Sequence, residues 1–250
     1  MRCYLTGPDG KLLRLEQSPA VFWKQLREAL ILLKKKWKFG KLKNLVVGSK
    51  GVWKIPDRRK LARSLRWAAE NVRAISDIEL AHAMAFQGKA GILIVAGTGS
   101  AAFGRDEKNH RARAGGLGPF LGDEGSAFWI GRETLKNPIL QKRLPKGLAL
   151  RLAHAQNPVR ETAKLARSIF KWARGNSSAR EIREEAAQEL AKLAVDLSRR
   201  LYFSGSIPVS WHGSLFKDKL FLQDFTKALK NQNPRFLPQK PKSLSRFPFS

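Results

Sequence analysis

Cysteine is nearly absent from the sequence, since Cys3 is the only one among 250 residues. A single thiol cannot form an intramolecular disulfide, and the chain has neither the cysteine pairs nor the closely spaced histidines of a zinc cluster. Acidic residues are also scarce, with 20 Asp and Glu against 48 Lys and Arg. We therefore expect no resident metal site of this kind and a reducing, cytoplasmic setting.

Long apolar runs are missing as well. The opening residues, MRCYLTGPDGKLLRLEQ, hold no unbroken apolar stretch of the kind found in secretory signals, and no later segment approaches the roughly 20 apolar residues of a membrane span. The sequence thus predicts a soluble protein with no membrane partner. Because 43% of the residues are hydrophobic, the chain can bury a substantial core in one large domain or two small lobes.

The formal net charge of +28 predicts attraction to polyanions such as nucleic acid. The basic residues are spread through every expected helix, with local clusters at 34–43, 142–151 and 235–246. The glycine-rich stretches 91–104 and 114–131 contain none. A solvated basic surface with nonspecific polyanion attraction therefore explains the charge better than a specific nucleic-acid groove, which stays an alternative.

Short apolar runs alternate with helical periodicity, which is typical of an α/β fold. The run GILIVA at 91–96 predicts a central strand buried on both faces. Before it we expect a hairpin around GPDG, a helix over 19–36, strands at 45–47 and 72–76, and helices over 58–71 and 78–86. After it we expect a helix from about Ser126, at least three helices within 146–201, a strand at 207–211, a helix at 220–229 and an irregular end over 231–250.

Two glycine-rich segments follow the central strand. In Gly97-Thr98-Gly99-Ser100 the glycines let backbone N–H groups approach an anion, and two hydroxyls can donate to phosphate oxygens. A tight hairpin of small residues explains these four letters equally well. It is not the dinucleotide-binding fingerprint, because no helix follows directly and its third glycine is missing.

The second segment, GGLGPFLGDEGS at 115–126, holds five glycines around an acidic pair. Its backbone could lie close to a ligand, and its carboxylates could accept hydrogen bonds from sugar hydroxyls or orient a hydrated metal. The alternative is that Asp123 or Ser126 caps the helix that begins there.

In combination, these segments resemble the central block of the N-acetylglucosamine kinases and the BadF/BadG/BcrA/BcrD ATPases, in the order strand, GTGS, hairpin, GG-x-G and GDEGSAFWIGRETL. The resemblance is strong over 46–135, where VGSKGVWKIPDRRKLARSL and ISDIELAHAMAF also match, and weaker towards both ends. It implies the two-lobe actin-like ATPase fold, related to ribonuclease H, with lobes at 1–89 and 90–250.

The resemblance implies an enzyme that uses ATP and Mg²⁺ to phosphorylate a sugar hydroxyl. Asp77 falls at the position of the family's catalytic base, although the residues alone would favour a helix N-cap there. The implied contacts with the nucleotide are Gly97, Thr98, Gly99, Gly213 and Ser214. The implied contacts with the sugar are Ser100, Gly116, Leu117, Gly118 and Asp123. We expect Asp77 and both glycine-rich turns to converge on one cleft, and a homodimer is a further possibility.

The sequence departs from the family's pattern in its first lobe. The opening MRCYLTGPDGKLL resembles the family's second strand, so we expect the first lobe of this chain to lack the first strand and its DGGGTKT-like phosphate loop. Either the true start lies upstream, or the protein lacks this half of its nucleotide clamp. Leu117 also replaces a sugar-contacting Trp. Two alternatives follow, which are a catalytically impaired homologue that binds sugar or nucleotide and a BadF/BadG-type ATPase. The second normally needs cluster-binding cysteines that this chain lacks.

Overall fold

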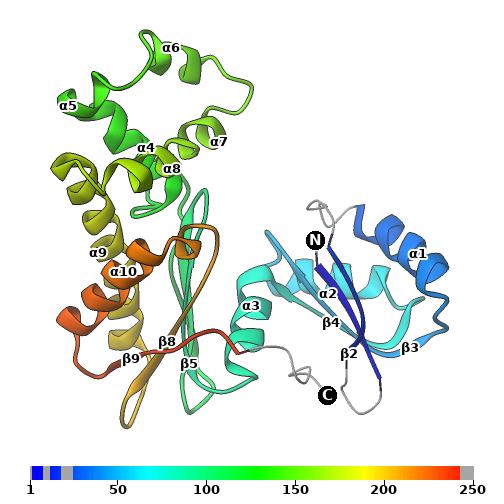
Figure 1. Ribbon diagram of the computed structural model, residues 1–250. Coiled ribbons are helices and arrows are strands. Elements are labelled where there is room, and N and C mark those ends of the chain that lie inside the picture. The colour runs from blue at the N-terminus through cyan, green and yellow to red at the C-terminus, as the bar shows by residue number, and fades with distance from the viewer. Residues whose placement is uncertain (1, 8–11, 18–24, 243–250) are drawn as a thin grey trace. The chain divides into compact units, whose positions relative to one another are not determined.

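The computed structural model describes residues 2–7, 12–17 and 25–242 (Figure 1). The chain divides into two compact units, with a boundary between Lys89 and Ala90. The first unit holds the residues up to Lys89 and also Lys242, whose amide donates a hydrogen bond to the carbonyl of Ala85 at 3.2 Å. The second unit is Ala90–Pro241. No helix within the described ranges is long and apolar enough to cross a membrane.

The first unit contains two separate two-stranded sheets. β1 and β2 form the antiparallel hairpin that the sequence predicts, and of its GPDG turn at 7–10 the residues 8–10 lie outside the described residues. β3 and β4 run parallel and are connected by α2. The elements are β1 (Arg2–Thr6), β2 (Leu12–Gln17), α1 (Leu26–Trp37), β3 (Leu42–Ser49), α2 (Ile55–Ser64), β4 (Ala69–Ser76) and α3 (Asp77–Phe86).

The helix expected over 58–71 is shorter than predicted, because α2 ends at Ser64. A turn over 65–68 follows, and β4 begins at Ala69, which lies opposite Leu42 of β3. By local propensity the run Ala68-Ala69-Glu70 favours a helix. It nevertheless leads into a strand, because β4 pairs with β3 from Ala69 onward and Ala69 is buried. Most of the helix expected over 19–36 is present as α1, and its first part, 19–24, lies outside the described residues.

The second unit is built on a five-stranded sheet in the order β7-β6-β5-β8-β9. The predicted central strand is confirmed, because β5 lies in the middle and Ile92, Leu93 and Ile94 are fully buried. The carboxyl-terminal region, expected to be irregular, instead contributes β9, which pairs with β8 alone. The strands are β5 (Gly91–Ala96), β6 (Ser100–Arg105), β7 (Arg111–Gly115), β8 (Ile207–His212) and β9 (Phe236–Pro238).

Helices complete the second unit, and α9 packs across β5, β6 and β7 (Figure 1). Its buried face is rich in alanine, including Ala186, Ala187 and Ala191, which lets the helix approach its neighbours closely. The breaks predicted at 157–158 and 175–178 both precede helix starts, capped by Asn157 and Asn176. The helices are α4 (Ala127–Lys136), α5 (Pro138–Gln141), α6 (Leu148–Ala153), α7 (Pro158–Ala163), α8 (Leu165–Trp172), α9 (Ser177–Arg200) and α10 (Lys219–Gln232).

Candidate functional site

The turn Gly97-Thr98-Gly99 connects β5 to β6 and is fixed by the start of α4. The amide of Ala127 donates to the carbonyl of Gly97 at 2.9 Å, and the amide of Phe128 donates to the carbonyl of Thr98 at 3.2 Å. The amides of Thr98 and Gly99 themselves donate to no acceptor within the described ranges. The Thr98 side chain is exposed. Two unused amides beside an exposed hydroxyl, on a fixed turn, are suited to binding a phosphate group.

Asp123 joins the second glycine-rich segment to this turn. Its Oδ1 accepts a hydrogen bond from the amide of Ser100 at 3.2 Å, and its side chain is buried. A Cβ atom at Gly99 would lie 2.6 Å from Asp123 Oδ2, so only glycine fits there without displacing the carboxylate. The Ser100 hydroxyl also donates to the carbonyl of Glu124 at 2.7 Å. The GTGS and GDEGS segments are therefore held together by these two hydrogen bonds and by the close packing of Gly99 against Asp123.

The capping role that the sequence left open between Asp123 and Ser126 belongs to Ser126. Its hydroxyl oxygen accepts a hydrogen bond from the amide of Trp129 at 3.2 Å, and α4 begins at Ala127. Asp123 instead adopts a left-handed backbone conformation, with φ of +64°. Asp is one of the few residues other than glycine that adopt this conformation readily, so Asp123 suits this turn.

The turn after β8 lies beside the turn after β5. The two strands are parallel, with His212 opposite Val95, so both turns leave the sheet at the same edge. A Cβ atom at Gly213 would lie 2.0 Å from the carbonyl oxygen of Ala96, and one at Gly97 would lie 3.9 Å from Ser214 Oγ. The structure thus brings the predicted nucleotide residues of the second unit together.

The remaining predicted sugar residues lie on the loop after β7. A Cβ atom at Gly116 would lie 3.1 Å from Ala101 Cβ, which places Gly116 next to the first residue pair of β6 and β7. Leu117 is 68% exposed, and a Cβ atom at Gly122 would lie 3.2 Å from its Cβ. Gly118 has no atom within 4 Å of the position that its Cβ would take. The sugar-contacting roles of these residues stay predictions.

Asp77 belongs to the first unit, where it is the first residue of α3. It is not the N-cap that the residues alone suggest, because that role belongs to Ser76. Ser76 and Glu79 form a capping box: the amide of Glu79 donates to Ser76 Oγ, and the amide of Ser76 donates to Glu79 Oε2. The Asp77 side chain is exposed, and within the described residues it accepts only from the amide of Ile78, at 3.0 Å. Its carboxylate is therefore available to a ligand.

A partly buried ion pair anchors this helix start. Both carboxylate oxygens of Glu79 accept hydrogen bonds from Arg58 of α2, at 3.2 and 2.8 Å. Burial acts to raise the pKa of Glu79, but the hydrogen bonds from Ser76 and the charge of Arg58 outweigh it, so the pKa lies below its ordinary value. The ion pair between Arg58 and Glu79 was not predicted from the sequence. The letters Ser-Asp-Ile-Glu contain the capping-box pattern, which predicts the hydrogen bonds between Ser76 and Glu79 but not the contact with Arg58.

We predict that Glu79→Gln lowers the free energy of unfolding by roughly 1–3 kcal/mol at neutral pH. Because the pKa is lower in the folded state, this contribution is present above about pH 4.3, the ordinary pKa of Glu, and is lost as the pH falls through the folded-state pKa. Urea unfolding at a series of pH values should therefore show the two proteins converging in acid. The exposed Glu124→Gln serves as the control, and a pH-independent difference would contradict the prediction.

No group of three or more His, Cys, Asp or Glu side chains suited to hold a metal ion occurs in the part of the chain that the structure describes. The acidic residues of the second unit's site, Asp123 and Glu124, form a pair only, and Glu124 is exposed while Asp123 is buried. We therefore derive no catalytic step through a metal ion held by these residues.

Comparison with known proteins assigns the chain to a family. The sequence pattern of the BadF/BadG/BcrA/BcrD ATPase family matches residues 61–245, which include Asp77, both glycine-rich segments and Gly213. The chain belongs to this family. The resemblance predicted from the central block is thus confirmed at the level of the family.

Two curated relatives are sugar kinases by name. The chain is 33% identical over 95 residues to the N-acetylmuramic acid/N-acetylglucosamine kinase of Clostridium acetobutylicum. The aligned region covers 37% of this chain and 31% of the relative. It is 34% identical over 83 residues to the N-acetyl-D-glucosamine kinase of Dictyostelium discoideum, covering 33% of this chain and 24% of the relative. The matches therefore span a third or less of either relative's length.

Solved structures show the fold. A protein from Chromobacterium violaceum, solved under the name N-acetylglucosamine kinase, superposes with a TM-score of 0.75 at 19% identity, covering 97% of this chain and 92% of that one. One from Porphyromonas gingivalis, solved under the same name, has a TM-score of 0.72 at 18% identity and covers 97% and 91%. The predicted actin-like ATPase fold is confirmed by these neighbours.

Proposed function

We propose that this protein is an ATP-dependent sugar kinase similar to the N-acetylglucosamine kinases. The observation that supports it most is the union of the two glycine-rich segments through Asp123, which accepts from the amide of Ser100. This union puts a turn with two unused amides next to a buried carboxylate. A phosphate-binding group and a hydroxyl-binding group side by side are what phosphoryl transfer to a sugar requires.

In the proposed reaction, Asp77 accepts the proton of the attacking sugar hydroxyl. The hydroxyl oxygen forms a bond to the γ-phosphorus of ATP, the bond from that phosphorus to the β–γ bridging oxygen breaks, and ADP leaves. An exposed carboxylate at a helix start suits this role because its own hydrogen bonding is limited to the Ile78 amide.

The proposed nucleotide contacts are at the carboxyl ends of β5 and β8. The amides of Thr98 and Gly99 and the Thr98 hydroxyl would donate to phosphate oxygens. Gly213 and the exposed Ser214 would lie against the adenosine. Mg²⁺ would enter with ATP and neutralise phosphate charge. A cytoplasmic location, where ATP is available, belongs to the same proposal.

The proposed sugar contacts are Asp123 and Ser100, with the loop of Gly116, Leu117 and Gly118 beside them. Asp123 Oδ1 is engaged by the Ser100 amide, while Oδ2 faces Gly99 and can accept from a sugar hydroxyl. We propose an N-acetylated amino sugar as the substrate, because both curated relatives are named for N-acetylglucosamine. The exposed Leu117 offers an apolar contact to such a sugar.

The test is release of ADP from Mg²⁺-ATP with a panel of hexoses, amino sugars and N-acetylated amino sugars, measured by a coupled assay. We expect N-acetylglucosamine or a close analogue to raise ADP release far above the sugar-free rate. Calorimetry with ATP and each sugar should accompany the assay. Binding of either ligand without turnover would replace the kinase by the impaired homologue, and no binding of either would remove both proposals.

A further inference from the structure

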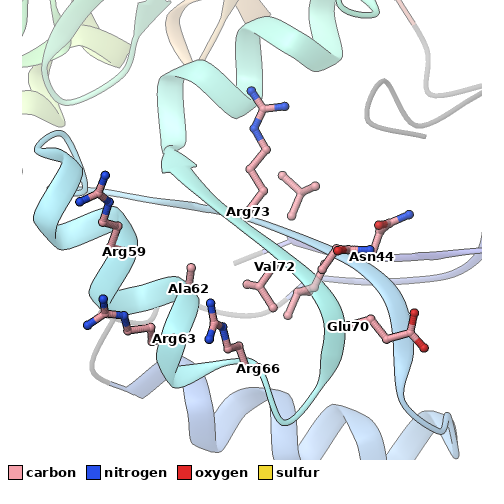
Figure 2. Close-up of a pocket in the computed structure, with 11 residues that line it drawn as sticks. Asn44, Arg59, Ala62, Arg63, Arg66, Glu70, Val72 and Arg73 are labelled. Carbon is pink, nitrogen blue, oxygen red and sulfur yellow. The ribbon is translucent and has the colours of Figure 1, made fainter.

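A groove of about 590 Å³ lies in the first unit, and none of the predicted kinase residues lines it. One side is formed by α2 with the turn after it, and the other by β3 and β4 (Figure 2). The groove crosses the two paired strands, because residues 44–46 of β3 line it together with the residues opposite them, 71–73 of β4. The lining residues are Asn44, Leu45, Val46, Arg59, Ala62, Arg63, Arg66, Glu70, Asn71, Val72 and Arg73.

The α2 side of the groove carries a row of arginines. Figure 2 shows Arg59, Arg63 and Arg66 following one another along α2 and the turn after it. All three side chains are exposed, and none makes a hydrogen bond or ion pair with another residue in the described ranges. Arg59 and Arg63 lie one helical turn apart, so their like charges repel each other. An anion bound between them would remove this repulsion.

The strand side of the groove adds further hydrogen-bond donors. Arg73 and the side-chain amides of Asn44 and Asn71 are exposed there, and guanidinium and amide N–H groups can donate to the oxygens of an anion. Glu70 is the one acidic residue among the described lining residues, and it forms no ion pair with the arginines. Four arginines against one glutamate leave the groove positively charged.

The basic residues that line the groove are of one type. All of them are arginines, although the whole chain contains slightly more lysines than arginines. A guanidinium presents its N–H groups as a planar fork that matches two oxygens of one phosphate group, whereas the ammonium of lysine acts as a point charge. A basic surface with no particular ligand has no reason to prefer arginine. The choice of arginine therefore favours phosphate groups as the anion.

We propose that this groove binds a small molecule that carries two or more phosphate groups on a compact scaffold. Side chains one helical turn apart are separated by about 6 Å, so phosphates at a similar spacing would each meet a guanidinium of the row. The groove's volume lies within the range of small-molecule sites, about 300–1,000 Å³. Ala62 and Val72 offer apolar contacts to the scaffold between the phosphates.

A single strand of nucleic acid also carries regularly spaced phosphates, but it fits this groove less well. Proteins that bind single strands stack the bases on aromatic side chains, and no aromatic residue is among the described residues that line the groove. The groove is also of the size that encloses one small ligand rather than a continuing chain. Binding of an oligonucleotide is therefore an outcome that the experiment must distinguish.

The test is isothermal titration calorimetry of the full chain with fructose 1,6-bisphosphate and with tripolyphosphate, at physiological ionic strength. We expect at least one of these probes to bind with a dissociation constant below about 1 mM. Glucose 6-phosphate, which has a single phosphate, should bind at least about tenfold more weakly than the better probe. The variant R59Q/R63Q/R66Q should weaken binding of that probe by about tenfold or more, because it removes the charge-assisted hydrogen bonds.

The matched control is K35Q/K41Q/K50Q. It removes the same charge from exposed positions of the same unit outside the groove, and we expect the affinity to change by less than about threefold. Thermal unfolding should show that both glutamine variants are folded like the wild type. Equal losses of affinity in the two variants would mean that the probe responds only to the overall charge, and would overturn the proposal.

The variant R59K/R63K/R66K separates a phosphate site from charge attraction alone. It keeps all three charges but loses the forked donors, so we expect binding to weaken by about fivefold or more. Three further results would each overturn the proposal. These are wild-type affinity in the lysine variant, no binding of either probe, and tighter binding of oligothymidylate than of either probe with loss of that binding in the arginine-to-glutamine variant.

Discussion

Replacement of Asp77 by Asn is expected to lower the rate of ATP-dependent sugar phosphorylation by roughly 10²- to 10⁴-fold, the range for loss of a positioned general base. Asn has nearly the shape of Asp but cannot accept the hydroxyl proton. The change should not disturb α3, because Ser76 and Glu79 provide the cap and Asp77 contributes only its contact with the next amide. We expect kcat to fall while the affinity for ATP stays within a few-fold, which steady-state kinetics and calorimetry measure together.

The matched control for this prediction is Asp57→Asn. Asp57 is also exposed and lies in the first turn of α2 in the same unit, so it carries the same charge at a similar helix position. It should retain the wild-type rate, and both variants should unfold within about 0.5 kcal/mol of the wild type. A D77N protein that keeps most of its activity would exclude Asp77 as the base.

Replacement of Gly213 by Ala is expected to destabilise the second unit by roughly 2–4 kcal/mol. A Cβ atom at this position would lie 2.0 Å from the carbonyl oxygen of Ala96, which belongs to the central strand and cannot move aside cheaply. The backbone φ of +121° is also a conformation that residues other than glycine rarely adopt. The melting temperature should fall by roughly 5–10 °C.

Gly175→Ala and Gly205→Ala are the controls, because neither position has an atom within 4 Å of the added methyl group or a positive φ. Differential scanning calorimetry should show both within about 2 °C of the wild type. If G213A shifts the turn without unfolding the unit, its affinity for ATP should fall instead. Wild-type stability together with wild-type ATP affinity would contradict the packing described for this turn.

The features that the sequence predicts correctly are those whose structure depends on a few neighbouring residues in the chain. Five apolar residues between Gly91 and Gly97 define β5, and glycines with small polar residues define the turn after it. The contact between Ser100 and Asp123 could be expected only from the family resemblance, since 23 positions separate them. The left-handed conformation of Asp123 could not be predicted from the letters, because Asp tolerates this conformation but does not require it.

The features that sequence reasoning missed depend on pairing between distant segments. β4 begins at Ala69 because β3 is beside it, whereas the local letters favour continuation of the preceding helix. The strand β9 was not predicted, because three residues ending in proline carry almost no strand signal. Proline is tolerated there because β9 pairs with a described strand on one side only.

Direct detection of the product is the most decisive experiment for this protein. Wild-type protein, Mg²⁺-ATP and N-acetylglucosamine should be followed by ³¹P NMR, with D77N alongside. We expect a sugar-phosphate resonance to grow in step with ADP in the wild-type sample and to be nearly absent with D77N. Appearance of inorganic phosphate without sugar phosphate, or equal product from both proteins, would contradict phosphoryl transfer to a sugar with Asp77 as the base.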